Sequence, residues 1–445
     1  MKKIFIRMGM TPMEGWTADK VLLEDAIGGN AGNLIYQYSV CRTLMTEGTE
    51  FTASRYLYSP LQAEEINHTC SHVVIPMADA FRASFTGGLK SLTKLVRAVK
   101  VPCIVIGAGL RAPLGKISYG DFPFNSQARD FVKAVLDKSP LISIRGEQTA
   151  EYLKYLGFAP ERDYTVTGCP SFYMFGDTLD VRDISKKRGG RICVNANPRL
   201  GSVSNSFLYR ILKEYPESVF IPQLQTEFRM IYTGAPAIYE YHTAEYPYTL
   251  RDPVYQEGRS RFFSDARSWM DFLSKSRVTI GSRIHGNIAS ILAGTPNILV
   301  MDDVRVEELA RYHKLNAVYP EDLSEGTSLE DLMERADYTP MRRAARKNFL
   351  HYIHFLDRCG LDHIYKGGDV PDTCPFDSII SKVPKAEPVK PVTAIPWDEL
   401  LERWDAFYPE YDTRYERNRQ SRVTYQRRLE TLPLPGSIKK KLLES

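Results

Sequence analysis

Residues 278–296 read VTIGSRIHGNIASILAGTP, and their pattern is the clearest indication of the fold class. Its first three residues form a β-branched run that predicts a buried strand, glycine and serine make a tight turn, and the apolar residues from Asn287 onward predict a short helix. A strand that passes through a tight turn into a helix is typical of a parallel sheet covered by helices. Arg283 and His285 are therefore expected just before a helix N-terminus.

The same alternation of strand and helix patterns fills most of the chain. Upstream, strands are predicted at residues 73–76, 103–106, 141–144 and 164–167, with amphipathic helices at 91–99 and 128–136. After a polar break at residues 178–190, strands are predicted at 191–195, 218–222 and 297–301, with a helix at 265–274. We therefore expect an α/β protein with two tandem doubly wound, Rossmann-like domains, residues 1–183 and 184–383.

Residues 384–445 are predicted to be a proline-linked, basic helical tail. Its connector contains Pro384, Pro388, Pro391 and Pro396, and apolar side chains then recur at helical spacing at Trp397, Leu400, Leu401 and Trp404. Arginines follow, interleaved with tyrosines: Arg414, Arg417, Arg419, Arg422, Arg427 and Arg428 with Tyr411, Tyr415 and Tyr425. We expect this tail to pack on the body or on a second copy of the chain in a homo-oligomer. The alternative is a peripheral contact with anionic lipid.

The composition excludes several classes of protein. The chain has 445 residues, of which 43% are hydrophobic and 25% charged, so it is neither disordered nor fibrous. Its formal charge of +4 is too small to indicate a nucleic-acid partner. The seven scattered cysteines favour a reducing compartment, so we expect a cytoplasmic protein that lies at most at the inner face of a membrane. The absence of GxxxxGK[ST], HExxH and GxSxG motifs excludes P-loop nucleotide hydrolases, zincins and α/β-hydrolases.

Arg283 and His285 place a cation and a titratable base in one strand-to-helix turn. Free backbone N–H groups and the helix dipole favour an anion there and disfavour an imidazolium, so we expect His285 to exchange protons near neutral pH. Together with Gly281, Ser282 and Gly286, these residues are predicted to form a substrate-binding turn. The alternative is that His285 only caps the helix or packs in the domain junction.

Two further turns have a similar plan. Arg145 follows the strand predicted at residues 141–144, and its planar guanidinium suits a carboxylate or phosphate better than a lysine would. The glycine-rich residues 28–33 precede an apolar helix, where Asn30 or Asn33 would cap the helix or donate to a substrate oxygen. The alternatives are an ion pair between Arg145 and Glu147 and a turn that is merely capped.

Together the three turns resemble the polysaccharide pyruvyl transferase family. Residues 281–286 with the later Ala293-Gly-Thr-Pro296 are similar to the family's SRxHG and GxP block. Ser143-Ile-Arg145 and Thr167-Gly-Cys-Pro-Ser171 resemble its SxR and GxP segments. Residues 29–33 resemble its NxGD turn, with Asn33 in place of the acidic residue. The similarity runs in the family's order over roughly residues 25 to 315.

The resemblance implies a glycosyltransferase-B-like fold that transfers a pyruvyl group from phosphoenolpyruvate to sugar hydroxyls, commonly as a cyclic ketal, in cell-surface or exopolysaccharide biosynthesis. Arg145 and Arg283 would then bind the donor's anionic groups, His285 would be the general acid and base, and Asn30 and Asn33 would help to position the donor. The acceptor would be a sugar or glycan, including a lipid-linked one. This chemistry requires no metal and no cofactor besides the donor, so we expect none.

Two other functions are compatible with the same residues. The first is a sugar-nucleotide-dependent glycosyltransferase of the same architecture, in which Arg283 binds the diphosphate and Glu308 the ribose. The second is a non-catalytic scaffold that recruits a polysaccharide-synthesis complex through its aromatic and basic tail.

Overall fold

The computed structural model describes residues 2–115, 117–184, 189–239, 241–301 and 303–431, and the backbone alone for most of residues 421–431. The chain forms two compact units, Met1–Ala394 and Ile395–Ser445. Part of the predicted break at residues 186–190 and the predicted basic side chains Arg422, Arg427 and Arg428, with Tyr425, lie outside the described part of the chain.

The first part of the larger unit is built on a parallel sheet. Four strands pair in the order β2 (Thr49–Ala53), β1 (Lys2–Ile6), β3 (His72–Pro76) and β4 (Cys103–Ile106). The parallel pair β5 (Ile142–Ile144) and β6 (Tyr164–Val166) continues this sheet, because Ala108 beyond β4 forms a parallel bridge with Ile144. The connecting helices are α1 (Ala18–Leu23), α2 (Gly32–Leu44), α3 (Ala63–Thr69), α4 (Thr86–Ala98), α5 (Asn125–Leu136) and α6 (Glu147–Tyr155).

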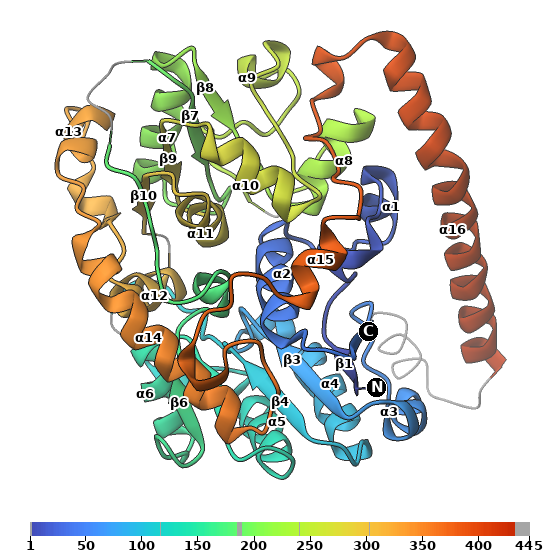
Figure 1. The fold of residues 1–445 in the computed structure, drawn as a ribbon. Helices are drawn as coiled ribbons and strands as arrows, with labels where there is room; N and C mark the ends of the chain where they lie inside the picture. Colours follow the sequence, from blue (N-terminus) through green and yellow to red (C-terminus); the bar gives the residue numbers. More distant parts are fainter. Residues whose placement is uncertain (1, 116, 185–188, 240, 302, 432–445) are drawn as a thin grey trace. The chain divides into compact units, whose positions relative to one another are not determined.

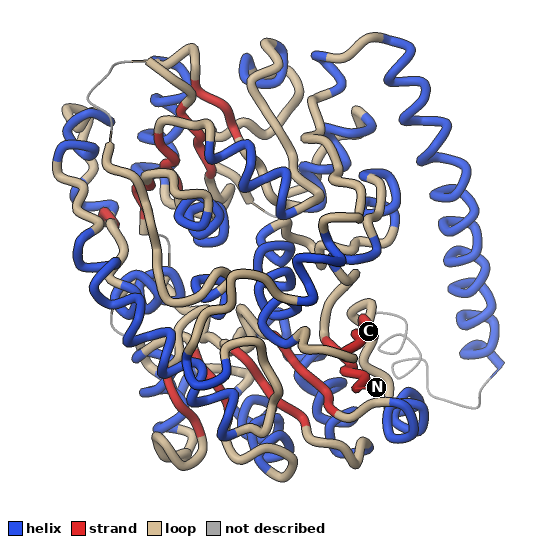
Figure 2. Tube along the Cα trace, in the orientation of Figure 1, coloured by secondary structure: helices blue, strands red, loops and turns tan. Residues whose placement is uncertain are grey.

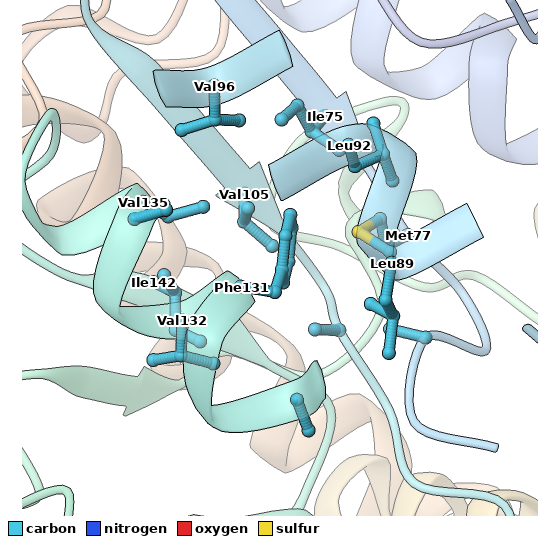
Figure 3. Packing of buried hydrophobic residues seen from close by; sticks show 14 of the residues in the cluster. Ile75, Met77, Leu89, Leu92, Val96, Val105, Phe131, Val132, Val135 and Ile142 are labelled. Carbon is cyan, nitrogen blue, oxygen red and sulfur yellow. The ribbon is translucent and has the colours of Figure 1, made fainter. Parts of the chain in front are cut away.

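Helices α4 and α5 supply much of the core on one face of this sheet (Figure 3). Their buried side chains recur every three or four residues, which places them on one side of each helix. In Figure 3, Leu92 and Val96 of α4 and Phe131 of α5 lie against Ile75 and Val105 of the sheet. Burial of strands on both faces is what a parallel sheet requires, and all four residues of β4 are buried.

The second part contains a five-stranded parallel sheet in the order β11 (Ala317–Val318), β10 (Asn297–Val300), β9 (Val278–Gly281), β7 (Ile192–Asn195) and β8 (Ser218–Phe220). Its helices are α7 (Ser202–Glu214), α8 (Gln225–Thr233), α9 (Pro253–Gln256), α10 (Ala266–Ser274), α11 (Ile284–Leu292), α12 (Val304–His313) and α13 (Leu329–Glu334). Figure 2 shows the two groups of strands separately, each flanked by helices.

Helix α11 begins at Ile284, three residues before the predicted start. Arg283 is its N-cap in an extended conformation, and the side-chain amide of Asn287 donates to the carbonyl oxygens of Gly281 and Arg283. This bridge ties the turn to the helix. His285 therefore lies within the first helical turn and not before it, which corrects the expectation from the sequence.

Two later helices return to the first sheet (Figure 1). In α14 (Thr339–Arg358), His351 hydrogen-bonds Thr165 at 2.8 Å. In α15 (Pro375–Ile380), Asp377 forms an ion pair with the buried Arg42 of α2 at 2.7 Å. These contacts hold the two parallel sheets in one unit, and α2 packs directly against α11 between them.

The smaller unit is dominated by the long helix α16 (Trp397–Thr431), so the tail is helical as predicted. Aromatic side chains pack on one another along it, for example Phe407 on Tyr411 with ring centroids 5.2 Å apart. Among the described residues, no helix is long and apolar enough to cross a bilayer. Two parallel sheets flanked by helices and followed by a helical tail confirm the predicted α/β class with two Rossmann-like sheets.

Candidate active site

A cavity of about 670 Å³ lies at the carboxyl ends of strands from both sheets. It is lined by Asn30, Asn33, Ser282, Arg283 and His285, so the structure brings five of the predicted site residues together. The other three, Arg145, Gly281 and Gly286, are not among its described lining residues. Ligands of open α/β sheets bind at this edge, where helix N-termini and loop side chains converge.

His285 is 8% exposed and contacts groups from several distant segments. Its ring meets the Tyr36 ring edge-on at a centroid distance of 5.9 Å, and its Nε2 lies 3.8 Å from the Cys169 sulfur. Burial, together with Arg145 and Arg305, lowers the pKa of His285 well below 6.5, so its imidazole is neutral. The near-neutral pKa expected from the sequence is therefore wrong, because the expectation did not include burial or the two cations.

Arg145 lies buried behind this histidine, with no exposed surface. Its Nε donates to the Gly107 carbonyl oxygen at 2.9 Å, and its guanidinium lies 5.5 Å from the centre of the Tyr36 ring. Its Nη1 has no hydrogen-bond partner among the described residues, and the alternative ion pair with Glu147 is not formed within them. The structure thus places Arg145 where its charge acts on His285, beneath the cavity wall.

Three arginines that the sequence pattern did not single out also line the cavity. Arg82, Arg111 and Arg305 converge on one carboxylate oxygen of Asp79, at 3.0, 2.5 and 3.2 Å. Burial alone would raise the pKa of Asp79, but the three guanidinium groups outweigh it and hold that pKa below its usual value. Asp303 also pairs with Arg305, at 3.2 Å, so two carboxylates face three cations at the cavity. A net positive charge therefore remains to attract an anion.

The sequence gives only a weak indication of these arginines, namely that each follows a strand. Asp79 and Arg82 follow β3, Arg111 follows β4, and Arg305 lies at the start of α12 after β10. Single arginines after strands have no diagnostic spacing. Only the order of the strands in the two sheets brings them together.

Arg283 lines the same cavity from the second sheet. Its backbone N–H donates to the Asn195 side chain at 2.8 Å and its Nε to the Ala196 carbonyl oxygen at 3.0 Å. Its Nη2 is buried without a hydrogen-bond partner among the described residues. Glu227 lies nearby, and burial raises the pKa of that carboxyl although the Arg283 charge opposes the rise. Arg283 is thus held by two hydrogen bonds, and its Nη2 remains available to donate to a ligand.

Asn30 and Asn33 of the first turn line the cavity and also form hydrogen bonds within the turn. Asn30 Oδ1 accepts the Gly32 N–H at 2.7 Å, and Asn33 Nδ2 donates to the Ile27 carbonyl oxygen at 2.8 Å. Gly32 permits the close contact of α2 with α11, because a Cβ there would lie 2.7 Å from the His285 Cβ. The turn therefore shapes the wall around His285.

Gly281 has a packing role that makes a testable prediction. A Cβ at this position would lie 1.8 Å from the Asn195 backbone oxygen, so β9 cannot accept a side chain there without moving β7. We expect Gly281→Ala to lower the free energy of unfolding by roughly 1–3 kcal/mol, the usual cost of overpacking. Thermal denaturation measures the change. The control is Gly87→Ala in α4, where a Cβ meets open space; a stability equal to that of the control would contradict the prediction.

Glu308, the residue assigned to ribose binding in the glycosyltransferase alternative, does not line this cavity. Its carboxylate accepts hydrogen bonds from the Thr149 backbone N–H at 2.9 Å and from the Thr149 hydroxyl at 2.8 Å. It is 2% exposed, and burial raises its pKa from 4.5 to about 8 although these hydrogen bonds oppose the rise. The residue thus links α12 to α6 in the interior.

This raised pKa predicts a pH effect on stability. Between pH 4.5 and 8 the folded protein retains a proton on Glu308 that the unfolded chain releases, so stability falls as the pH rises through this window. The contribution of this group is at most about 1.4 kcal/mol per pH unit. We expect the melting temperature of wild type to fall relative to that of Glu308→Gln between pH 5 and 8. Parallel melting curves would refute the prediction.

Several solved structures are similar to this chain at low sequence identity. The chain is similar to UDP-N-acetylglucosamine 2-epimerase from Neisseria meningitidis, at 11% identity over 80% of this chain and 100% of the other, with a TM-score of 0.37. It is also similar to the 2-epimerase from Rickettsia bellii (11% identity; 80% and 98% covered; TM-score 0.38) and to the glycosyltransferase SnogD from Streptomyces nogalater (12%; 86% and 98%; 0.30). The search of curated proteins gave no match.

A family model provides the decisive comparison. The model described as polysaccharide pyruvyl transferase matches residues 25–303, which includes the first glycine-rich turn, Arg145 and the turn with Arg283 and His285. The match ends just after the β10 strand, and the segments around Asp79 and Arg111 fall within it. Most of the cavity residues lie within the match, whereas Arg305 follows its end. The match covers more than half of the sequence, so the chain belongs to the polysaccharide pyruvyl transferase family.

Proposed function

We propose that this protein transfers a pyruvyl group from phosphoenolpyruvate to sugar hydroxyls and forms a ketal. One observation carries the proposal: a single cavity is lined by His285, by Arg283, and by a cluster of arginines that follow strands of both sheets. Phosphoenolpyruvate has a carboxylate and a phosphate on a three-carbon frame, so it needs at least two cationic sites a few ångströms apart. Guanidinium groups suit both anions because they donate paired hydrogen bonds.

The donor is proposed to lie between Arg283 and the arginines that surround Asp79. The spare Nη2 of Arg283 supports this placement, as does the position of Arg305 at the N-terminus of α12. Backbone N–H groups at a helix N-terminus favour an anion. The same groups would stabilise the charge that develops on the departing phosphate.

The reaction balances with no further reactant. The donor methylene gains a proton and becomes a methyl group, the first acceptor hydroxyl adds to the central carbon, and the second displaces phosphate from it. Two C–O bonds form and the C–O bond to phosphate breaks. Of the two hydroxyl protons, one is retained in the methyl group in net terms and the other leaves on inorganic phosphate.

His285 is proposed to move these protons as general acid and base. Its pKa is lowered by burial and by Arg145 and Arg305. A bound donor would bring negative charge close to the ring and offset the two cations, which would raise the imidazole pKa toward the working pH. Arg145 thus has a proposed role through His285 in addition to the donor binding predicted from the sequence: it keeps the ring neutral until the anionic donor arrives.

The test is mass spectrometry of glycans incubated with the full-length protein and phosphoenolpyruvate, with free phosphate measured in parallel. A panel of aryl glycosides and lipid-linked saccharides covers the acceptor classes. We expect pyruvate incorporation with one phosphate released per ketal. A thermal-shift series separates the alternatives, because a donor at 100 times its Kd should stabilise the protein by about 2.7 kcal/mol. Stabilisation by a nucleotide sugar, with no pyruvate incorporation, would support the glycosyltransferase; no turnover of either donor would support the scaffold.

A further inference from the structure

The cavity has a second wall whose chemistry differs from that of the arginine cluster. The segment between α8 and α9, residues 234–252, contributes Ile238, Tyr239 and Tyr241 to the lining. Ile238 is 75% exposed and Tyr241 59% exposed, so both offer apolar surface to a ligand in the cavity. A volume of about 670 Å³ is in the range that holds a ligand much larger than a three-carbon donor.

Hydrogen bonds anchor the chain near these exposed side chains. The Ile238 N–H donates to the Thr226 hydroxyl at 2.7 Å, and the Asn205 side-chain amide donates to the Thr243 hydroxyl at 2.9 Å. The Tyr246 hydroxyl donates to the buried carboxylate of Glu227. Ile238, Thr243 and Tyr246 are therefore anchored to the body of the protein. Anchored residues lose less conformational entropy when a ligand binds beside them.

A hydrogen-bond donor also lines the cavity, next to Gly286. Gln223 lines the cavity, is 1% exposed, and its Nε2 has no hydrogen-bond partner among the described residues. A buried amide donor without a partner is costly, and a ligand oxygen would remove that cost. The cavity thus combines an apolar surface with a polar group that is unsatisfied.

We infer that this wall is the acceptor subsite, and that a pyranose ring of a glycan stacks its C–H face on Tyr241 and Ile238. A pyranose has an apolar face of C–H groups and a rim of hydroxyls, which matches an aromatic surface beside the Gln223 amide. The anionic donor would occupy the arginine side, so the two substrates meet near His285. This inference rests on the proposed function and adds to it the position and the recognition chemistry of the acceptor.

The test compares two tyrosines of the same segment. Tyr241 lines the cavity, whereas Tyr248 is 40% exposed and is not among the described lining residues. With acceptor varied at saturating phosphoenolpyruvate, we expect Tyr241→Ala to raise the acceptor KM roughly tenfold, equivalent to about 1.4 kcal/mol. The KM for phosphoenolpyruvate should not change. Tyr241→Trp should retain most of the acceptor affinity, and Tyr248→Ala should behave as wild type. An unchanged acceptor KM in Tyr241→Ala, or an equal change in Tyr248→Ala, would overturn the inference.

A binding measurement separates this inference from the proposed function. Saturation-transfer NMR with the aryl glycoside panel requires no turnover and reports which protons approach the protein. We expect the strongest transfer at the sugar ring C–H protons in wild type and its loss in Tyr241→Ala. If glycosides bind in this way but no pyruvate is transferred, the subsite stands and the proposed function fails. If pyruvate is transferred and Tyr241→Ala changes neither binding nor KM, the proposed function stands and the subsite is wrong. Failure of every glycoside to bind would overturn both.

Discussion

His285→Ala is expected to lower kcat by roughly 10² to 10⁴, the usual range for loss of a general acid or base. The ring lines the cavity, is 8% exposed, and is kept neutral by burial and by the charges of Arg145 and Arg305. Proton transfer to the methylene carbon and from the acceptor hydroxyl both need a group at this position. Donor affinity should change little because the cationic groups that bind it remain. Phosphate release with time measures kcat, and a thermal-shift titration measures donor binding.

Two further variants separate the loss of proton transfer from the loss of side-chain volume and from general effects of removing a histidine. His285→Gln keeps much of the ring's volume beside Tyr36 but cannot move protons, so it should be as inactive as His285→Ala and closer to wild type in melting temperature. His354→Ala removes an exposed histidine of α14 outside the cavity lining and should retain full activity. A purified His285→Ala protein that turns over at the wild-type rate would refute the assignment.

Asp79→Asn is expected to give the largest loss of stability at the site. This change removes the one carboxylate that contacts all three of Arg82, Arg111 and Arg305, and leaves only the Asp303 carboxylate beside Arg305, without altering the size of the side chain. Three guanidinium groups then repel one another in a partly buried place. Loss of one partner of a buried ion pair costs about 3–5 kcal/mol, and the partial exposure of these arginines places the expected cost near 2–3 kcal/mol.

The same variant tests whether the arginines bind anions. Phosphate or phosphoenolpyruvate supplies the missing negative charge, so either should raise the melting temperature of Asp79→Asn more than that of wild type. Asp271→Asn is the control, because Asp271 pairs only with exposed lysines and its removal should cost little. If Asp79→Asn melts like wild type and does not respond to phosphate, the carboxylate does not organise the cluster.

The sequence was sufficient to predict most of the strands and three of the turns. Val278, Thr279 and Ile280 end in a glycine turn that leads to a helix, and such a pattern depends on local periodicity alone. Arg283 and His285 were found because they share one turn with a recognisable motif. Arg82, Arg111 and Arg305 were missed because each lies in a different turn, with no spacing that relates them.

By itself, the sequence determined the α/β class, the helical tail and the turns that carry Arg145, Arg283 and His285. These features depend on hydrophobic periodicity and backbone preferences, which act between residues close together in the chain. Tertiary structure alone decided that Arg145 lies beneath the cavity, that Asp79 gathers three arginines, and that the His285 imidazole is neutral. Charge and protonation depend on desolvation and on cations a few ångströms away, and both are supplied by segments distant along the chain.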